Sequence, residues 1–325
     1  MTSMRAAICN SYGDAQSIRI TDVERPKRQP GELLVEVRAS SINPVDWKIL
    51  RGDLRVIYGL KPPRIIGGDF AGVVLESDAN SRFKPGQKVW GLTDIRKLKS
   101  TPGAHCEITR CASQIVDSMP ETLSFTEAAT LPLVGLTAYQ SLVHHAQVQS
   151  GQKVLVNGCS GGVGLIAVQL AKALGAHVTG VCSQSNHDIA YQMGCDQVID
   201  YQTHDPLATS ETFDVWFDVV GKYSLRQTRH QLNSTGTYLN IVKLLSTSLS
   251  RLFNPFRQQS SHAVFVSPSA DDLAILRKLI DASAIRPIIE RTYPLAAIAD
   301  ALTRSRTHRV VGKLAVSMAR TPTGD

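Results

Sequence analysis

The first third of the chain alternates short hydrophobic and polar runs, a pattern typical of β-strands with one buried face. Turn-forming Pro and Gly residues separate these runs, for example at 30–31 and 85–86. We therefore expect an all-β domain, built as a small barrel. The runs predicted as strands are 5–9, 17–21, 32–38 and 72–76.

From about Thr126 the pattern changes to helices, predicted at 125–131 and 137–143, followed by alternating strands and helices. Such alternation predicts a parallel, doubly wound sheet. A further strand at 264–266 is expected at the sheet edge, and the chain then continues through an amphipathic helix at 271–280 to a last strand at 313–317. The strands expected inside the sheet are 154–157, 177–182, 197–200, 213–220 and 236–242.

A glycine-rich turn directly follows the first strand of this region. Gly158, Gly161 and Gly164 have the spacing G-x-x-G-x-x-G, and an apolar helix continues to Gly175. Glycines in such a turn let a pyrophosphate approach the amides at the helix N-terminus. A glycine turn alone fits any strand and helix, but strand, turn, helix and second strand in this order favour a dinucleotide site. We expect a Val at Gly161 or Gly164 to lower NADPH affinity while the fold survives.

The second strand of this region indicates which dinucleotide is bound. NAD sites usually place a carboxylate after this strand, where it would repel the 2'-phosphate of NADPH. Here residues 182–187 carry only thiol, hydroxyl, amide and imidazole side chains, and the first acid is Asp188. We therefore expect NADPH. The alternative is that these residues cap the next helix.

Composition narrows the function classes. The 325 residues are 43% hydrophobic and 19% charged, which fits a globular protein of two domains. No apolar run could span a bilayer and no secretory signal is recognisable, so a cytoplasmic location is expected. Six scattered cysteines agree with reduced thiols. The net charge of +7 comes without a nucleic-acid motif, so we expect no nucleic-acid partner and attribute the charge to attraction of an anionic cofactor.

Five motifs in order resemble the medium-chain dehydrogenase/reductase superfamily, and four of them its quinone oxidoreductase branch. The first is similar to chloroplast-envelope quinone oxidoreductase homologues. The resemblance implies an α/β fold: a GroES-like β-barrel catalytic domain, residues 1–124 and 267–325, and a Rossmann NADPH-binding domain, residues 125–266. The motifs are SINPVDWK (41–48), GGDFAG (67–72), LPLVGLT (131–137), GCSGGVG (158–164) and HRVVGKLAV (308–316).

The resemblance also bears on metal binding. In the zinc branch of the superfamily, a cysteine stands at the position of Asn43 and a histidine at that of Gly68. Neither residue present here is a zinc ligand of that kind. His105 fits a strand motif of the family in which it is a surface side chain. We therefore expect no metal.

Without a Lewis acid, hydride transfer from NADPH to an electron-poor acceptor is the easier reaction, so the expected substrate is a quinone or an α,β-unsaturated ketone. Asn43 is the candidate hydrogen-bond donor near the nicotinamide ribose or the substrate oxygen; alternatively it caps the turn before Pro44. Lys48 and Tyr58 are candidate proton sources. Two rival functions remain open: a zinc-free enoyl or alcohol-type reductase, and a non-catalytic NADPH-binding protein.

The cofactor residues follow from the same resemblance. Thr137 matches a hydroxyl near the nicotinamide, and Ser183 and Tyr201 match positions near the adenosine 2'-phosphate. Asn186 departs from the lysine or arginine that many relatives carry there, for which His187 could compensate. The residues expected to cradle the pyrophosphate are Ser160, Gly161, Gly162 and Val163, and those expected to line the nicotinamide side are Val220 and Ile241.

Two surface features concern partners. An apolar edge strand at 264–266 invites pairing with a second chain, so we expect a homodimer. The segment 243–257 combines Leu and Phe with basic residues. It fits either a helix packed over the sheet or a mobile apolar flap that favours long-chain enones and makes weak peripheral contact with anionic membrane.

Overall fold

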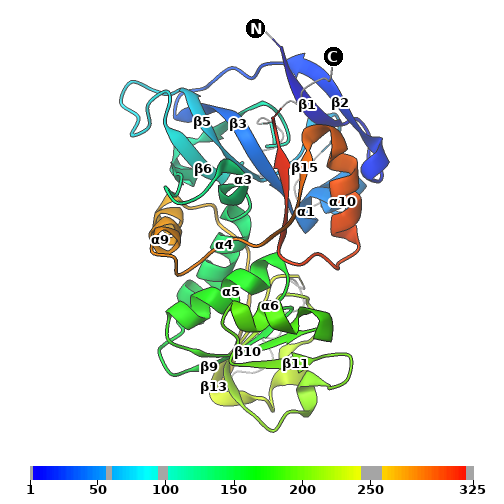
Figure 1. Ribbon diagram of the computed structural model, residues 1–325, viewed down its shortest axis with the longest axis vertical. Coiled ribbons are helices and arrows are strands. Elements are labelled where there is room, and N and C mark those ends of the chain that lie inside the picture. The colour runs from blue at the N-terminus through cyan, green and yellow to red at the C-terminus, as the bar shows by residue number, and fades with distance from the viewer. Residues whose placement is uncertain (1–2, 56–60, 94–101, 243–257, 320–325) are drawn as a thin grey trace. The chain divides into compact units, whose positions relative to one another are not determined.

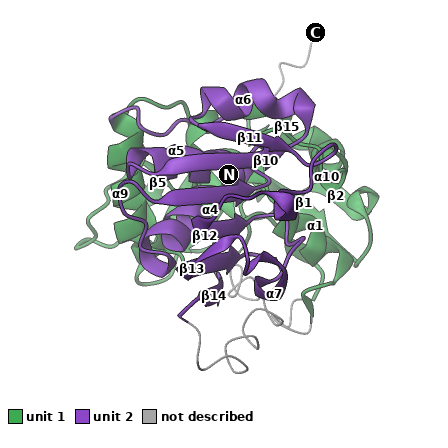
Figure 2. Cartoon of the chain, turned by 90° about the horizontal axis from the view of Figure 1, so that it is seen from below, with its two compact units in different colours: residues 1–133, 268–281, 289–325 green, residues 134–267, 282–288 purple. Residues whose placement is uncertain are grey.

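The computed structural model describes residues 3–55, 61–93, 102–242 and 258–319. The chain divides into two compact units (Figure 2). Unit 1 comprises residues 1–133, 268–281 and 289–325, and unit 2 comprises residues 134–267 and 282–288.

The unit boundaries differ from those expected at two places. Residues 125–133 belong to unit 1, because α3 (Phe125–Ala128) packs against strands β3 (Glu32–Ile42) and β5 (Asp69–Glu76) of that unit. Residues 282–288 belong to unit 2, where the Gln169 side chain exchanges hydrogen bonds with the backbone of Arg286.

Unit 1 contains a seven-stranded sheet in the order β15-β16-β3-β5-β6-β8, with β7 paired to β3, and a three-stranded sheet in the order β2-β1-β4. The strands expected in this region are confirmed as β1 (Ser3–Cys9), β2 (Ile18–Glu24), β3, β5 and β16 (Lys313–Ser317), and all but β16 are longer than expected. The unit also contains strands that were not predicted: β4 (Arg64–Ile65), β6 (Lys88–Leu92), β7 (Ile108–Ala112), β8 (Val116–Ser118) and β15 (Ile289–Pro294).

The core of unit 1 lies between these strands and a few helices. Leu33, Phe70 and Leu314 belong to one buried apolar cluster with Trp47 of α1. Figure 1 shows α10 alongside β15, and α10 also contacts α1. The helices are α1 (Pro44–Arg51), α3, α9 (Ala270–Asp281) and α10 (Ile298–Arg306), with 3-10 turns η1 (Ala15–Ser17), η3 (Ser113–Ile115) and η7 (Leu295–Ala297).

Unit 2 is built on a six-stranded parallel sheet in the order β11-β10-β9-β12-β13-β14, whose strands lie side by side in Figure 2. Counted from β9, this is the order 3-2-1-4-5-6 of a dinucleotide-binding sheet. The expected doubly wound sheet is therefore confirmed. Its strands are β9 (Lys153–Asn157), β10 (His177–Cys182), β11 (Gln197–Asp200), β12 (Phe213–Asp218), β13 (Leu232–Asn240) and β14 (Ser260–Ala263).

The helices of unit 2 follow the strands as predicted. Helix α4 (Pro132–Tyr139) begins in unit 1 and continues as a π-helical segment, η4 (Gln140–His145), so the helix expected at 137–143 starts earlier. The remaining helices are α5 (Gly162–Ala173), α6 (His187–Gln192) and α7 (Leu225–Thr228), with 3-10 turns η5 (Gln184–Asn186) and η6 (Pro206–Ala208).

The predicted position of the edge strand is wrong. The last strand of the sheet is β14, at Ser260–Ala263, and residues 264–266 lie beyond it. Val264 still donates from its amide to the Asn240 carbonyl at 2.9 Å, whereas Phe265 is 57% exposed. The apolar run therefore marks the exit from the sheet, and the paired strand itself is polar.

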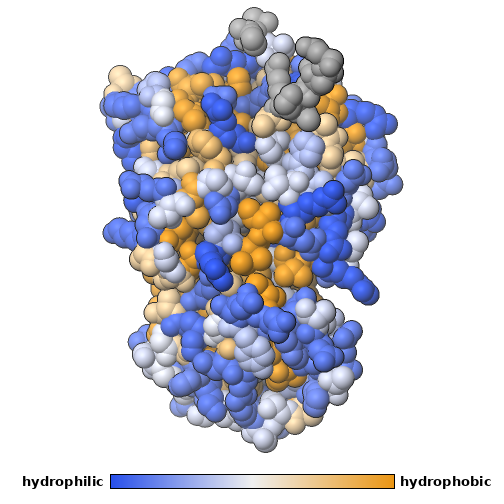
Figure 3. Space-filling model, in the orientation of Figure 1, coloured by the Kyte–Doolittle hydropathy of each residue, from blue (hydrophilic) through white to orange (hydrophobic). Residues whose placement is uncertain are grey.

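Polar and charged side chains cover much of the face seen in Figure 3, with apolar residues between them. No helix within the described part of the chain is long and apolar enough to cross a bilayer. The segment 243–257 lies outside the described residues.

Candidate functional site

Asn43 lies at the junction of β3 and α1 in unit 1. Its extended backbone and the following Pro44 begin the helix. The Asn43 backbone N–H donates to the Asp46 carboxylate at 2.7 Å, and the Asp46 backbone N–H donates to the Asn43 backbone carbonyl at 3.0 Å. The backbone of Asn43 therefore caps the turn, as one alternative held, while its side chain points elsewhere.

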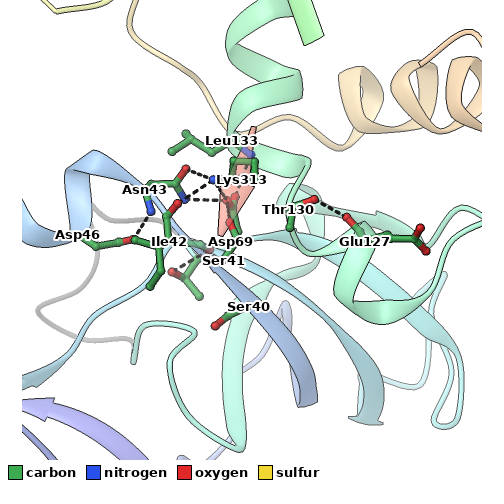
Figure 4. Close-up of polar contacts among 12 residues, drawn as sticks. Ser40, Ser41, Ile42, Asn43, Asp46, Asp69, Glu127, Thr130, Leu133 and Lys313 are labelled. Atoms are coloured by element: carbon green, nitrogen blue, oxygen red, sulfur yellow. Dashed lines mark hydrogen bonds and ion pairs between the residues drawn. The ribbon is translucent and has the colours of Figure 1, made fainter. Parts of the chain in front are cut away.

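The Asn43 side chain bridges two buried charged groups (Figure 4). Its Nδ2 donates to the Asp69 carboxylate at 2.7 Å, and its Oδ1 accepts from the Lys313 ammonium at 2.5 Å. Because ammonium is only a donor and carboxylate only an acceptor, one orientation of the amide is favoured. The charges of Lys313 and Asp69 therefore fix which end of the Asn43 side-chain amide faces each of them.

Asp69, the first residue of β5, is the hub of this cluster. Its Oδ2 accepts from the Ser41 hydroxyl at 2.6 Å and from Asn43, and its Oδ1 accepts from the Leu133 amide at 2.8 Å. Complete burial raises the pKa of the Asp69 carboxyl above its usual range, and the Lys313 ammonium opposes that rise. The nearest approach of ammonium and carboxylate is 3.7 Å, between Nζ and Oδ2.

Lys313 begins β16, which pairs antiparallel with β3. Its ammonium donates to the Ile42 carbonyl at 2.9 Å as well as to Asn43. Burial lowers the pKa of Lys313, and the carboxylates of Asp69 and Asp46 oppose that change. We define Ser41, Asn43, Asp69 and Lys313 as the Asn43 cluster.

Sequence reasoning did not assign Asp69 and Lys313, although both stand in motifs that carried the resemblance. The signal was available. Each is a charged residue at the start of a largely apolar, buried strand, and the two charges are opposite. A lone charge in a buried strand needs a partner, so the two residues could have been paired.

The prediction that His105 is a surface side chain is wrong. His105 is fully buried, with Nδ1 2.9 Å from the Ser40 hydroxyl and Nε2 3.8 Å from the Asp46 carboxylate. A side chain on Gly67 would come within 2.8 Å of the imidazole ring, so this glycine makes room for it. The segment turns inward because the Ala7 amide bonds to the His105 carbonyl at 2.9 Å.

The former zinc-ligand positions hold Asn43 and Gly68. Among the described residues, no group of three or more His, Cys, Asp or Glu side chains is arranged to hold a metal ion. The nearby thiols of Cys106 and Cys111 are buried, which raises the pKa of Cys106 to about 12 and also raises that of Cys111.

Of the two candidate proton sources, one lies in the described part of the chain. The Lys48 ammonium on α1 is 5.6 Å from the centre of the Trp47 ring, and within the described residues it is not hydrogen-bonded to the cluster. Tyr58 lies outside the described residues. Their roles remain predictions.

The glycine turn of unit 2 connects β9 to α5, as predicted, with Gly161 as the N-cap of the helix. A side chain on Gly164 would lie 2.1 Å from the Gly158 carbonyl oxygen, so helix and turn require glycine there. A side chain on Gly161 would meet that oxygen only at 3.6 Å. The expectation that both valine variants keep the fold therefore needs correction: Gly164 serves packing, while Gly161 leaves room for a ligand.

Several predicted cofactor residues stand on or near this turn. The pyrophosphate candidates Ser160, Gly162 and Val163 are partly exposed at the start of α5. A helix N-terminus presents free amides and a positive dipole end to an anion. Open space at Gly161 and a helix N-terminus beside it together fit a dinucleotide pyrophosphate.

The structure also brings together residues expected at the adenosine ribose. The Asn186 amide donates to the Ser160 hydroxyl at 3.1 Å, which ties η5 to the glycine turn. Neither Ser183 nor Asn186 caps a helix with its side chain, so the alternative capping role is not seen. Tyr201 is 51% exposed, and its amide donates to the Cys182 carbonyl at 3.3 Å, directly before Ser183.

Another buried aspartate lies beside the end of β9, the strand that leads into the turn. Asp218, the last residue of β12, accepts from the Asn157 amide at 2.7 Å and from the Tyr238 hydroxyl at 3.1 Å. It also accepts from the backbone amides of Gly221 at 2.9 Å and Tyr223 at 2.8 Å. We define Asn157, Asp218, Tyr223 and Tyr238 as the Asp218 cluster, which sequence reasoning missed.

The loop after β12 carries the predicted residue Val220. Its side chain is 57% exposed and occupies the space above Gly158, where an added Cβ would lie 2.7 Å from it. Ile241 follows β13 and is partly buried. Thr137 on α4 is buried, at 5% exposure. The contacts of these three residues with a cofactor remain predictions.

Comparison with known proteins identifies the family. Residues 29–148 match the alcohol dehydrogenase GroES-like domain, and residues 193–316 match the zinc-binding dehydrogenase family. Over 98% of the chain and 90% of the relative, the sequence is 31% identical to the mitochondrial NAD(P)H oxidoreductase RTN4IP1 of Bos taurus. It is 29% identical to the chloroplast envelope quinone oxidoreductase homolog of Arabidopsis thaliana, covering 96% of the chain and 98% of that protein.

Solved structures agree. The quinone oxidoreductase from Coxiella burnetii superposes with a TM-score of 0.88 at 28% identity, covering 98% of this chain and all of that one. The expected α/β fold, a GroES-like domain plus a Rossmann sheet, is therefore confirmed, and the relatives support a nicotinamide-dependent oxidoreductase. The chain belongs to the medium-chain dehydrogenase/reductase superfamily.

Proposed function

We propose that this protein is an NADPH-dependent reductase that transfers a hydride, without zinc, to a quinone or to the double bond of an α,β-unsaturated ketone. The observation that carries the proposal is the Asn43 cluster. A buried, oriented amide stands where the zinc branch has a cysteine ligand, and Gly68 stands where that branch has a histidine. Hydrogen bonding to an oxygen is the chemistry that such a site offers.

Hydride transfer to a quinone or an enone leaves negative charge on an oxygen. Donors that are already oriented stabilise such charge most effectively, because they need no reorganisation during the reaction. In this proposal Asn43 supplies the donor. The reduced nicotinamide supplies the hydride when it is bound. The final proton comes from Lys48, Tyr58 or solvent.

The preference for NADPH rests on the end of β10. Residues 182–187 hold no carboxylate, and Ser183 and Asn186 offer a hydroxyl and an amide to a 2'-phosphate. The Ser160–Asn186 contact supports one binding surface for the pyrophosphate and the ribose phosphate.

The test is NADPH oxidation by the purified chain against a panel of simple quinones, short enones and long-chain enones, with NADH run in parallel. The proposal predicts turnover of at least one class and a lower KM for NADPH than for NADH. NADPH binding without turnover of any acceptor would favour a non-catalytic role. Reduction of NADP⁺ by an alcohol, with no acceptor reduced by NADPH, would favour an alcohol-type enzyme.

Metal content is tested separately. Elemental analysis of the purified protein should find no stoichiometric zinc, and chelators should leave the activity unchanged. One tightly bound zinc per chain would contradict the proposed mechanism.

A homodimer is part of the proposal. Strand β14 is the outermost strand in the described sheet of unit 2. A strand in that position can pair with the same strand of a second copy. Sedimentation should find a dimer at micromolar concentration, and a monomer alone would exclude this assembly.

A further inference from the structure

We propose that Lys313 is a positioning residue for the reaction: its buried ammonium orients and polarises the Asn43 amide, so that an Asn43 N–H backed by a fixed positive charge faces the oxygen of the reduced acceptor. The inference rests on the proposed function and adds to it a second residue, which acts on the acceptor through Asn43.

The first step is orientation. Asn43 uses its carbonyl oxygen on Lys313 and one amide hydrogen on Asp69. A flipped amide would set its NH₂ group against the ammonium and its oxygen against the carboxylate, and both contacts would be repulsive. Within the described residues Asn43 Nδ2 makes this one hydrogen bond, so the second amide hydrogen keeps a defined direction and is the one that the proposal offers to a ligand.

The second step is polarisation. An ammonium that donates to the amide oxygen draws electron density toward that oxygen and makes the amide hydrogens more acidic. Hydrogen bonds in such a chain strengthen one another, and a low local dielectric increases the effect. The Lys313 and Asp69 side chains are only 7% and 0% exposed, so water screens this charge weakly. The Asp69 carboxylate accepts from the same NH₂ group and offsets part of this polarisation, so the expected result is an oriented amide hydrogen with modestly increased acidity.

The third step concerns cost. Burying an ammonium and a carboxylate loses most of their hydration, and a buried ion pair can often be replaced by apolar residues without loss of stability. The pair at Asn43 is therefore poorly explained as a stabilising device. A role in directing the amide accounts for its position.

The main experiment compares the wild type with the double variant Lys313→Met/Asp69→Asn. This variant removes both charges together, and an Asn at 69 can still accept from Ser41 and Asn43. Ser40→Ala is the matched control, because it deletes another buried hydrogen bond of β3, to His105, outside the Asn43 cluster. We expect kcat of the double variant to fall roughly 100-fold, with NADPH Kd changed less than about threefold and the control unchanged.

A readout independent of activity is the NMR signal of the Asn43 side-chain amide. In the wild type its two protons should be well separated, with the Asp69-bonded proton downfield. In the double variant they should move upfield and converge. Unchanged amide signals would overturn the proposal, as would shifted signals with an unchanged kcat. If the wild type turns over no acceptor, the proposed function fails while this measurement still tests the positioning.

If the double variant does not fold, a titration of the wild type replaces it. The groups that face the Lys313 ammonium are the Asp69 and Asp46 carboxylates, with His105 beside Asp46. Burial lowers the pKa of Lys313, so its charge should be lost at a lower pH than for an ordinary lysine. As pH rises and that charge is lost, the two Asn43 amide proton signals should move upfield and converge, and kcat should decrease over the same pH range. An amide that does not respond while Lys313 titrates would overturn the proposal.

Discussion

Each unit of this protein contains a fully buried aspartate at one end of a strand, Asp69 in unit 1 and Asp218 in unit 2, and the two are satisfied in different ways. Asp69 accepts from a hydroxyl, a side-chain amide and a backbone amide, and it lies 3.7 Å from an ammonium. Asp218 accepts from neutral groups only: a side-chain amide, a phenol and two backbone amides.

The different partners of the two aspartates match the roles proposed for the units, cofactor binding in unit 2 and contact with the substrate oxygen in unit 1. In the Asp218 cluster two donors are main-chain groups of the loop after β12, so the carboxylate fixes the shape of a loop. Burial of the Tyr238 hydroxyl raises its pKa, and the nearby Asp218 carboxylate raises it further, which keeps that donor protonated. In the Asn43 cluster the partners are mainly side chains, one of them charged. A carboxylate held by neutral donors therefore suits a binding surface, whereas an ion pair suits a site where charge develops on a substrate.

The largest effect is expected when the charged network loses one partner. Lys313→Met leaves the Asp69 carboxylate buried without its cation, which should cost about 3–5 kcal/mol in the free energy of unfolding. The double variant Lys313→Met/Asp69→Asn should recover part of that loss, because no unpaired charge stays buried, although the new side-chain NH₂ group then faces the Leu133 amide donor. Urea unfolding of both variants measures the difference. Equal losses would mean that the pair is not electrostatically coupled.

A substitution in the Asp218 cluster should lower the free energy of unfolding by less. Asp218→Asn turns one acceptor into a donor that faces other donors, so we expect about 3 kcal/mol lower stability. Because the loop carrying Val220 loses its anchor, NADPH affinity should also fall by about tenfold. Urea unfolding and fluorescence titration with NADPH test both parts. Lower stability with unchanged affinity would separate this loop from the cofactor site.

The glycine turn allows a matched pair of variants within unit 2. Gly164→Ala places a methyl against the Gly158 carbonyl, which should cost about 1–3 kcal/mol of stability. Gly161→Ala has room in the folded protein, so its stability should stay near that of the wild type while NADPH affinity falls about tenfold. Full NADPH affinity in the Gly161 variant would remove the pyrophosphate from this turn.

The smallest expected effect concerns cofactor choice. Ser183→Asp puts a carboxylate at the end of β10, where it would repel a 2'-phosphate. The ratio of kcat/KM for NADPH to that for NADH should drop by about tenfold, with the folding stability unchanged. Ser210→Asp, on an exposed stretch that precedes β12, is the control for a general charge effect. An equal drop in both variants would place the adenosine ribose elsewhere.

Much of this architecture could be predicted from the sequence. Hydrophobic periodicity identified β1, β2, β3, β5 and β16 of unit 1 and every strand of unit 2 except β14, and the glycine spacing identified the turn between β9 and α5. These features are local, because alternation and turn chemistry act within a few residues of chain. The presence of Asn43 and Gly68 at the former zinc-ligand positions could likewise be seen from the motifs alone.

Tertiary structure alone decided which residues meet. Lys313 and Asn43 are 270 positions apart, and no local pattern says that one donates to the other. His105 turned inward because its backbone joins β1 and Gly67 leaves room for its ring. The edge strand lies at 260–263 because pairing with β13, not apolar content, defines it. Periodicity reports which face of an element is buried, but the partners across a core are set by how distant elements pack, and here that packing assembles the charged cluster.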